Sequence, residues 1–245
     1  MPTIQILATS DTHDQPFAGE LMSIAYSAGV TPDLIVHCGD ATNCGTVGEV
    51  ERFGMQLEEL YRAFACPILF VPGNHDLLFE RQPGLGEQIL QDRVPGIQVS
   101  SKLGVITYAG IQILCNPYCP PVGNWAFCMT NKNLHAALSN AFIVPRVDLV
   151  VSHAPPLGIL DSVGYSTEYL GYGALREKVV SRTPLLLCGH IHEHGGKRQV
   201  FRETTVINCA GAGMLCEINT KEIGNVEKGL HPGRNIRKRK VNSRP

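Results

Sequence analysis

Strand-length apolar runs alternate with longer amphipathic segments in the first third of the chain. The apolar runs are residues 3–10, 33–38 and 67–72, and continuous runs of this kind are typical of strands buried on both faces. Between them we expect helices over 17–28 and 47–64, the second with apolar residues at the spacing of one helical face. This order of strands and helices predicts a mainly parallel sheet with helices packed on it.

The middle of the chain has a different pattern. Residues 105–115 have Gly110 between two short apolar pieces, which predicts a hairpin. Residues 116–128 are rich in Pro, Gly and aromatic side chains, which indicates an irregular wall rather than a linker. Strand and helix signals then resume, and we predict strands at 147–152 and 184–188, a helix at 170–181, and a hairpin of 199–201 with 204–208.

The length of 245 residues suits one large α/β domain and is too short for two full domains. We predict a single domain over 1–230 and a basic tail over 231–245 with almost no large apolar groups. The net charge of −1 gives the body no overall basic field for binding a polyanion. No apolar run approaches the ~20 residues that span a bilayer, and no leader pattern stands at the start. These features predict a cytoplasmic protein without a membrane partner.

Five polar motifs each follow a short apolar segment. They are, in order, Asp11-Thr12-His13, Gly39-Asp40, Gly73-Asn74-His75-Asp76, His153 and Gly189-His190-Ile191-His192. In a mainly parallel sheet, ligands collect in the crevice beyond the carboxyl ends of the strands. Because side chains two apart on a strand point the same way, Asp11 with His13, and likewise His190 with His192, are expected to bind one ion together.

The donor types in these motifs predict a two-metal hydrolytic site. Asp40 has two oxygens and could bridge two ions about 3.5–4 Å apart. Imidazole, carboxylate and amide donors without thiolate suit manganese, iron or zinc. Two divalent ions, two carboxylates and a bridging hydroxide leave a charge of about +1 to meet a phosphoryl group. The expected ligands are Asp11, His13, Asp40, Asn74, His153, His190 and His192.

Two residues of the third motif are predicted to be catalytic rather than ligands. His75 follows the ligand Asn74, where it could protonate a leaving alkoxide. Asp76 is then expected to orient His75 or raise its basicity. We interpret His37 as a core residue or one that supports the metal ligands, and for His194 an exposed loop position is favoured over contact with substrate. Four aromatic side chains are candidates for stacking on substrate, although wall packing is favoured for each: Tyr118, Trp125, Tyr165 and Tyr169.

Nine cysteines occur mostly in apolar settings, which is typical of small buried side chains in a reducing compartment. Cys115, Cys119 and Cys128 lack a second CxxC pair, so a structural zinc there is disfavoured.

The five motifs together resemble those of the calcineurin-like metallophosphoesterase superfamily, from Ile4 to about Ala210. The resemblance implies a four-layer α/β/β/α sandwich of two mixed β-sheets flanked by helices, with two divalent ions, manganese first and iron or zinc as alternatives. It also implies His75 as the catalytic histidine. One metal would be held by Asp11, His13, Asp40 and His192, and the other by Asp40, Asn74, His153 and His190.

A narrower likeness rests on further segments. The run Ser152-His153-Ala154-Pro155-Pro156-Leu157-Gly158 with Asp161, the run Asn124-Trp125-Ala126-Phe127 and Val144-Pro145 look like the small metallophosphoesterase-domain-containing phosphodiesterases. Those relatives carry Gly-Pro-Pro where this chain has Ala154-Pro155-Pro156. The likeness implies hydrolysis of a small phosphodiester, such as a cyclic nucleotide.

Other functions stay open at this point. A nuclease acting on DNA or RNA is supported only by the basic tail. A protein phosphatase is disfavoured because no arginine follows Gly39-Asp40. A non-catalytic binding scaffold of the same fold is disfavoured because every ligand position is kept. The sequence leaves open the preference for monoesters or diesters, and the oligomeric state.

Overall fold

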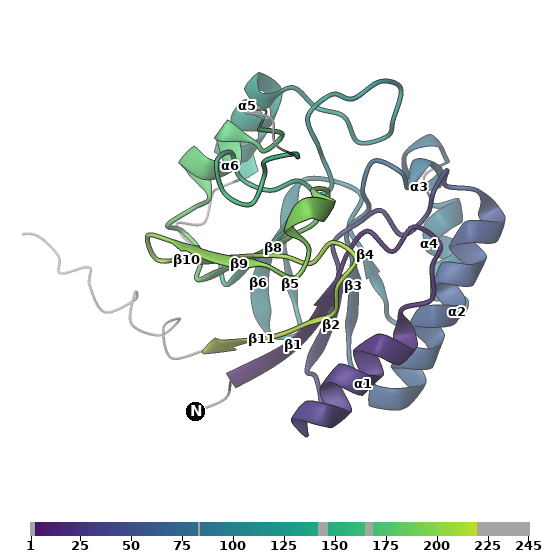
Figure 1. Cartoon of the computed structure of the whole chain (residues 1–245). Helices are drawn as coiled ribbons and strands as arrows, with labels where there is room; N and C mark the ends of the chain where they lie inside the picture. Colours follow the sequence, from purple (N-terminus) through teal and green to yellow (C-terminus); the bar gives the residue numbers. More distant parts are fainter. Residues whose placement is uncertain (1–2, 83, 142–146, 165–168, 220–245) are drawn as a thin grey trace, which may run out of the picture.

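Two β-sheets lie face to face, and helices cover the outer face of each sheet (Figure 1). The computed structural model describes residues 3–82, 84–141, 147–164 and 169–219. Parallel and antiparallel pairs occur in both sheets. The predicted four-layer α/β/β/α sandwich of two mixed sheets is therefore confirmed.

The first sheet has the strand order β11-β1-β2-β3-β4. Its strands are β1 (Thr3–Thr9), β2 (Leu34–His37), β3 (Ile68–Phe70), β4 (Gln98–Val99) and β11 (Met214–Asn219). The first four are parallel, while β11 pairs antiparallel with β1 and was not predicted. The helices of this half are α1 (Ala18–Ala28), α2 (Val47–Phe64), α3 (Leu77–Arg81) and α4 (Leu85–Gln91). The two helices predicted here are present, and α3 and α4 are additional.

The second sheet has the order β5-β6-β7-β8-β10-β9, with antiparallel strands at both edges. Its strands are β5 (Gly104–Tyr108), β6 (Ile111–Asn116), β7 (Leu149–Ser152), β8 (Leu185–Cys188), β9 (Arg198–Phe201) and β10 (Thr204–Asn208). Both predicted hairpins are present, as β5–β6 and β9–β10. On this half lie α5 (Asn131–Ala141), which was not predicted, α6 (Gly173–Lys178) and the short 3-10 helix η1 (His192–His194).

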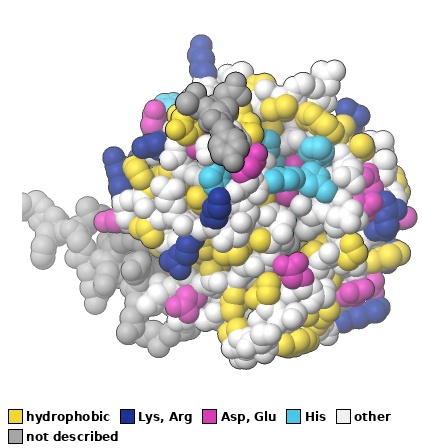
Figure 2. All heavy atoms as spheres, in the orientation of Figure 1, with side chains coloured by type: hydrophobic (Ala, Val, Ile, Leu, Met, Phe, Trp, Pro, Cys, Tyr) yellow, Lys and Arg dark blue, Asp and Glu magenta, His cyan; other side chains and the backbone are white. Residues whose placement is uncertain are grey.

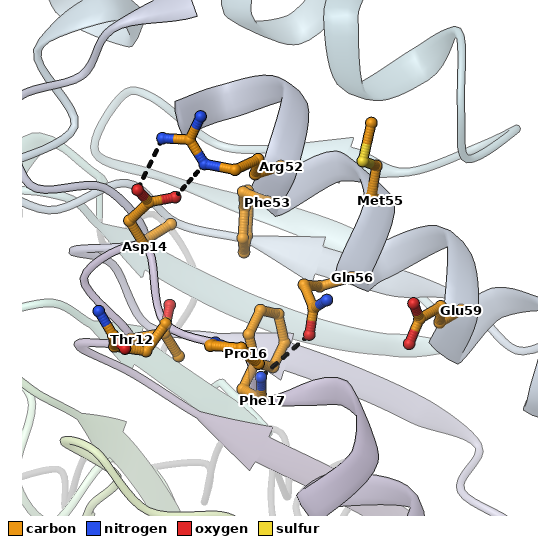
Figure 3. A pocket seen from close by; sticks show the side chains of 11 residues that line it. Thr12, Asp14, Pro16, Phe17, Arg52, Phe53, Met55, Gln56 and Glu59 are labelled. Carbon is orange, nitrogen blue, oxygen red and sulfur yellow. Dashed lines mark hydrogen bonds and ion pairs between the residues drawn. The ribbon is translucent and has the colours of Figure 1, made fainter. Parts of the chain in front are cut away.

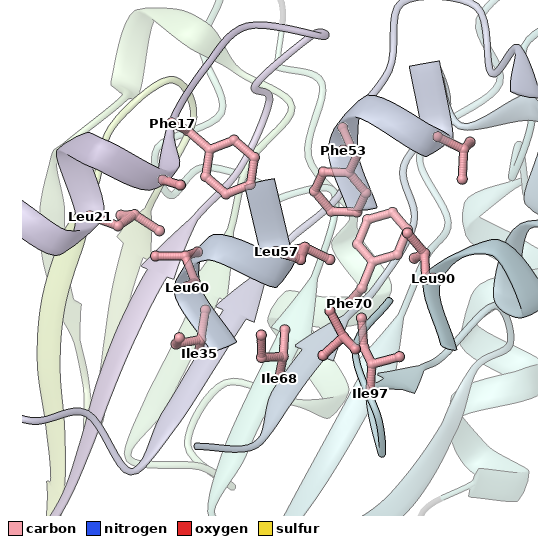
Figure 4. Close-up of a cluster of buried hydrophobic side chains, with 14 of the residues drawn as sticks. Phe17, Leu21, Ile35, Phe53, Leu57, Leu60, Ile68, Phe70, Leu90 and Ile97 are labelled. Carbon is pink, nitrogen blue, oxygen red and sulfur yellow. The ribbon is translucent and has the colours of Figure 1, made fainter. Parts of the chain in front are cut away.

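Alternate side chains of the central strands enter different layers of the core. In β2, Ile35 packs under α1 and α2, whereas Leu34 and Val36 pack between the two sheets. Figure 4 shows the first of these layers, where Phe53 and Leu57 of α2 meet the sheet. Each such side chain contributes about 1.5–3 kcal/mol when fully buried. Burial on both faces explains why the strands are continuously apolar.

The helix predicted over 170–181 is shorter than expected. The stretch from Leu170 to Tyr172 is held in an extended path, because Tyr172 N–H donates to the Pro155 carbonyl and Leu170 N–H donates to the Asp161 carbonyl. Only Gly173–Lys178 is then free to form α6. The domain end at residue 230, the basic tail, Val144-Pro145 and Tyr165 lie outside the described residues. Among the described helices, none has the length and apolar character needed to cross a membrane.

Candidate metal centre

Donor atoms from loops of both sheets form three-residue clusters, and within each cluster they lie within 4.8 Å of one another. We name two of these clusters: the outer group is Asp11, His13 and His192, and the inner group is Asp40, His153 and His190. A third cluster, His13 with Asp40 and His75, connects the two. Asn74 joins the inner group through its Oδ1, 3.0 Å from His153 Nε2. The structure thus brings all seven expected ligands together, and Figure 2 shows histidines gathered on one face. Their role as ligands stays a prediction.

The donors follow the carboxyl ends of β1, β2, β3, β7 and β8, as predicted, but the second reason we gave, strand alternation, is wrong. The residues do not lie on strands, since β1 ends at Thr9 and β8 ends at Cys188. Asp11, His13 and His190 have φ values of 54°, 45° and 69°, in the left-handed region that non-glycine residues rarely adopt. Sharp turns, not strand alternation, direct these side chains inward. His192 joins the outer group and His190 the inner one, so the structure does not bring these two together as expected, whereas Asp11 and His13 do fall in one group. This division matches what the resemblance implied.

The outer group brings two imidazole nitrogens and a carboxylate together at the rim. His192 Nε2 lies 3.2 Å from His13 Nε2 and 3.3 Å from Asp11 Oδ1. Both oxygens of Asp11 also accept the backbone N–H of His190, at 3.0 and 2.9 Å. Burial raises the pKa of Asp11, but the hydrogen bond to His192 and the charge of His153 outweigh it and lower the pKa overall. Asp11 is therefore a carboxylate at neutral pH.

The inner group is the buried half of the centre. His153 Nδ1 lies 2.9 Å from the Cys38 carbonyl oxygen, which can only accept, so Nδ1 carries the proton. Its Nε2 faces two further acceptors, Asp40 Oδ2 at 3.4 Å and Asn74 Oδ1 at 3.0 Å. Three electron-rich atoms that converge in this way need a cation between them, so the site fits a metal ion. Without one a proton takes that place: burial lowers the pKa of His153, but attraction to Asp40 raises it to about 9.

Two glycines of the motifs allow this close approach. Gly39 has φ +104°, and a Cβ there would lie 2.6 Å from His153 Nδ1. A Cβ at Gly73 would lie 2.6 Å from His153 Cε1 and would overlap the Asp40 carboxylate. Side chains at these positions would force the loops of the first sheet away from the second. The glycines in Gly-Asp and Gly-Asn-His-Asp are thus needed for packing across the two sheets.

His75 is oriented by a backbone carbonyl and not by Asp76, which corrects our prediction. His75 Nδ1 donates to the Asn43 carbonyl oxygen at 2.7 Å, and this leaves Nε2 for the site. The Asp76 carboxylate instead accepts from Gly73 N at 2.8 Å, from Thr42 N and Oγ1 at 3.0 and 2.9 Å, and from a further loop amide, and we find no bond to His75 among the described residues. Asp76 therefore ties the β2 and β3 loops together. Burial raises its pKa to about 6.

The remaining candidates have structural roles. His37 is a core residue as predicted: it is fully buried between Phe17, Phe53 and Phe70, and burial lowers its pKa to about 3. The exposed position expected for His194 is wrong, because it is partly buried and its Nε2 lies 2.9 Å from Ser162 Oγ. None of the metal-binding clusters in the described residues contains a cysteine. Sequence reasoning missed the contacts of Asn43 and Trp125 with His75.

A pocket of about 280 Å³ is lined by Thr12 and Asp14, the sequence neighbours of His13, and by side chains of α2 (Figure 3). It lies between α2 and the loop that follows β1. Asp14 of that loop forms a two-fold hydrogen-bonded ion pair with Arg52 of α2, at 2.8 and 2.6 Å. Gln56 Oε1 accepts the N–H groups of Phe17 and Ala18 at 3.0 and 3.1 Å. These contacts fix the loop that carries Asp11 and His13.

Comparisons with known proteins agree with the site. A family model described as calcineurin-like phosphoesterase matches residues 4–194. Human "Metallophosphoesterase domain-containing protein 1" is 27% identical over 241 residues, a match covering 89% of this chain and 68% of that protein. "UPF0046 protein K07C11.7" of Caenorhabditis elegans is 28% identical over 235 residues, covering 91% and 74%.

The fold is also that of a solved structure. The crystal structure of TT1561 of Thermus thermophilus has a TM-score of 0.58 at 15% identity, and the match covers 85% of this chain and 91% of that chain. Both the superfamily and the closer likeness predicted from the motifs are confirmed. With the family model covering most of its length, the chain belongs to the calcineurin-like phosphoesterases, and it is a metal-dependent phosphoesterase.

Proposed function

We propose that this phosphoesterase hydrolyses small phosphodiesters, such as cyclic nucleotides, with two divalent ions, preferably manganese. The observation that carries the proposal is the pair of donor groups from two sheets, connected by Asp40 and by His75. Ions bound there would neutralise phosphoryl oxygens and lower the pKa of the attacking water. The donors are imidazole, carboxylate and amide without thiolate, which supports manganese, with iron and zinc as alternatives.

The charge of the centre favours a diester over a monoester. The ion pairs that Asp11 and Asp40 make within the described residues are with His192 and His153, and not with Arg or Lys. Two divalent ions, two carboxylates and a hydroxide sum to about +1. A phosphodiester brings one negative charge, which the net charge of about +1 at the centre balances. A phosphomonoester brings about −1.5 to −2 at neutral pH. The residues after Asp40, Ala41-Thr42-Asn43, supply no Arg or Lys for the excess, and a protonated His75 would face the leaving oxygen rather than the other phosphoryl oxygens.

His75 supplies the proton that the leaving oxygen needs. Its Nδ1–H is committed to the Asn43 carbonyl, so Nε2 is the atom that exchanges a proton with the substrate. As the bond from phosphorus to the leaving oxygen breaks, Nε2–H donates its proton to that oxygen and the alcohol departs neutral. General acid catalysis of this kind contributes about 10²–10⁴-fold to the rate.

An activity panel with added manganese tests the proposal. The substrates are an aryl phosphomonoester, an aryl phosphodiester, 2′,3′- and 3′,5′-cyclic nucleotides, and single-stranded DNA. We expect the highest kcat/KM on a small diester, no turnover after chelation, and none from Asp40→Asn protein purified in parallel. A higher kcat/KM on the monoester would overturn the diester assignment, and one on single-stranded DNA would support a nuclease. Less than one ion per chain, without rescue by manganese, would indicate a non-catalytic scaffold of the same fold.

A further inference from the structure

The indole of Trp125 lies on the imidazole of His75. The ring centroids are 3.9 Å apart and the planes are inclined by 34°, the shortest ring separation among the described residues. Trp125 comes from the irregular segment between β6 and α5, fifty positions after His75. Offset aromatic pairs of this kind contribute about 0.5–1.5 kcal/mol beyond the area they bury.

The contact with Trp125 completes the support around the ring of His75. The Asn43 carbonyl fixes Nδ1 at 2.7 Å. The ring of His13 stands at 87° to that of His75, with centroids 4.8 Å apart. With the indole on one face, rotation of the imidazole about its side-chain bonds is restricted. The direction of Nε2 is then set by the protein before substrate binds, which is the kind of placement that proton transfer requires.

Trp125 is itself held against the loop that carries His75. The N–H of Ala126 donates to the Asn74 carbonyl at 3.1 Å, and the N–H of Phe127 donates to Glu80 Oε1 at 2.7 Å. The indole also packs against the core layer under α2. Because the two residues that follow it in the chain are anchored, its position on His75 does not depend on a ligand. One face of the indole is therefore already occupied, and this contact explains its placement without a substrate base.

We propose that Trp125 is a positioning residue that acts through His75 and holds Nε2 toward the leaving oxygen. The assignment rests on the proposed function, in which His75 protonates that oxygen. Proton donation matters most when the leaving alcohol is a poor leaving group. Loss of Trp125 therefore lowers kcat mainly for poor leaving groups and changes KM little.

A double-mutant cycle with two substrates tests this role. The variants are Trp125→Leu, His75→Asn and the combination, assayed with manganese on two aryl diesters that differ only in the leaving phenol. For Trp125→Leu we expect kcat to fall about tenfold with the poor leaving group, and about twofold or less with p-nitrophenol, with KM within about twofold. In the His75→Asn background, Trp125→Leu has no further effect, because its effect passes through His75.

Matched variants separate positioning from folding. Trp125→Phe keeps an aromatic ring and is expected to retain most of the activity. Val122→Ala removes an exposed apolar group from the same segment and is expected to change nothing. Metal content and thermal unfolding are measured for every variant. If Trp125→Leu unfolds or loses its ions, the double-mutant cycle is repeated with Trp125→Phe in its place. The loss in kcat is then expected to be smaller, and again absent in the His75→Asn background.

Each other result has a definite meaning. The positioning role would be overturned if Trp125→Leu lowered kcat equally on both substrates and this loss added to that of His75→Asn. It would also be overturned if Trp125→Leu raised KM at constant kcat, which would make Trp125 a substrate contact. If His75→Asn lowered kcat but Trp125→Leu did not, only the assignment of Trp125 would be overturned. A fully active His75→Asn would overturn the acid role in the proposed function and, with it, this inference.

Discussion

The inner and outer donor groups differ in how firmly the protein holds them. In the inner group His153 is fully buried and Asp40 is 2% exposed. In the outer group the side chain of His192 is 60% exposed, although its partner Asp11 is buried. His153 directly follows β7, whereas His192 lies in the 3-10 turn well beyond the end of β8. Because a buried ligand is held by its neighbours and is less hydrated, we expect the inner ion to be bound more tightly than the outer one.

The largest expected effect is the loss of both ions. Asp40 belongs to the inner group and to the cluster that connects it to the outer group, so Asp40→Asn removes the charge that both ions share. We expect metal affinity to fall by more than about 100-fold, since even loss of a ligand's supporting contact costs 10–100-fold, and turnover to be lost. Elemental analysis after dialysis measures this. Asp92→Asn, which changes an exposed carboxylate at the end of α4, is the control, and an equal loss of metal there would contradict the assignment.

A smaller effect separates the two groups. His192→Ala is expected to lose the outer ion and keep about one ion per chain. His153→Ala is expected to lose the inner ion and to be less stable, because it leaves Asp40 buried beside an empty space. Stoichiometry at rising manganese concentration and urea unfolding of each variant measure the contrast. The difference between inner and outer groups is refuted if both variants bind the same number of ions with the same affinity.

The smallest effect concerns His37, which forms hydrogen bonds with the loops that follow β1 and β2. Its Nε2 lies 3.1 Å from Thr12 Oγ1, and its Nδ1 accepts the N–H of Gly39. Burial lowers its pKa to about 3 from 6.5, so the folded protein keeps it neutral while the unfolded chain takes up a proton below pH 6.5. Its contribution to stability is therefore complete above pH 6.5 and is lost as the pH falls toward 3. Between pH 6.5 and 5 this amounts to about 2 kcal/mol.

Comparing the wild type with His37→Gln isolates the contribution of His37 protonation to the free energy of unfolding. Chemical unfolding of both proteins at pH 6.5 and pH 5 gives the change in the free energy of unfolding. The wild type is expected to lose about 2 kcal/mol more than the variant over this interval. An equal loss in both proteins would mean that His37 is not the group that takes up the proton.

Sequence reasoning selected donor residues that the fold does bring together, although in part for the wrong reason. The motifs at the ends of apolar runs pointed to Asp11, His13, His190 and His192, but left-handed turns at the first three and the 3-10 turn at His192, rather than strand alternation, direct the side chains. Asp76 was expected to contact its neighbour His75, yet its carboxylate is turned to the loop after β2. Adjacency in sequence does not give the direction of a side chain when the backbone turns between the two residues.

Elements that depend on distant partners were also missed. β11 is a short segment whose strand character comes from pairing with β1, more than two hundred residues earlier. Nothing in the spacing of Trp125 places it on His75, because anchors from Asn74 and Glu80 set the path of its segment. The extended stretch from Leu170 to Tyr172, which shortens α6, likewise depends on the Pro155 carbonyl.

The sequence by itself determined the donor types and the reaction class. Apolar runs predict the strands of the sheet, and the Asp, Asn and His residues that follow them predict the donor atoms at the strand ends. Tertiary structure alone decided how these donors are brought together and which group orients the ring of His75. His153 meets the Cys38 carbonyl across 115 positions, and His13 meets His192 across 179. Contacts between two facing sheets at such separations are set by packing and by sharp turns, and neither leaves a local signal in the chain.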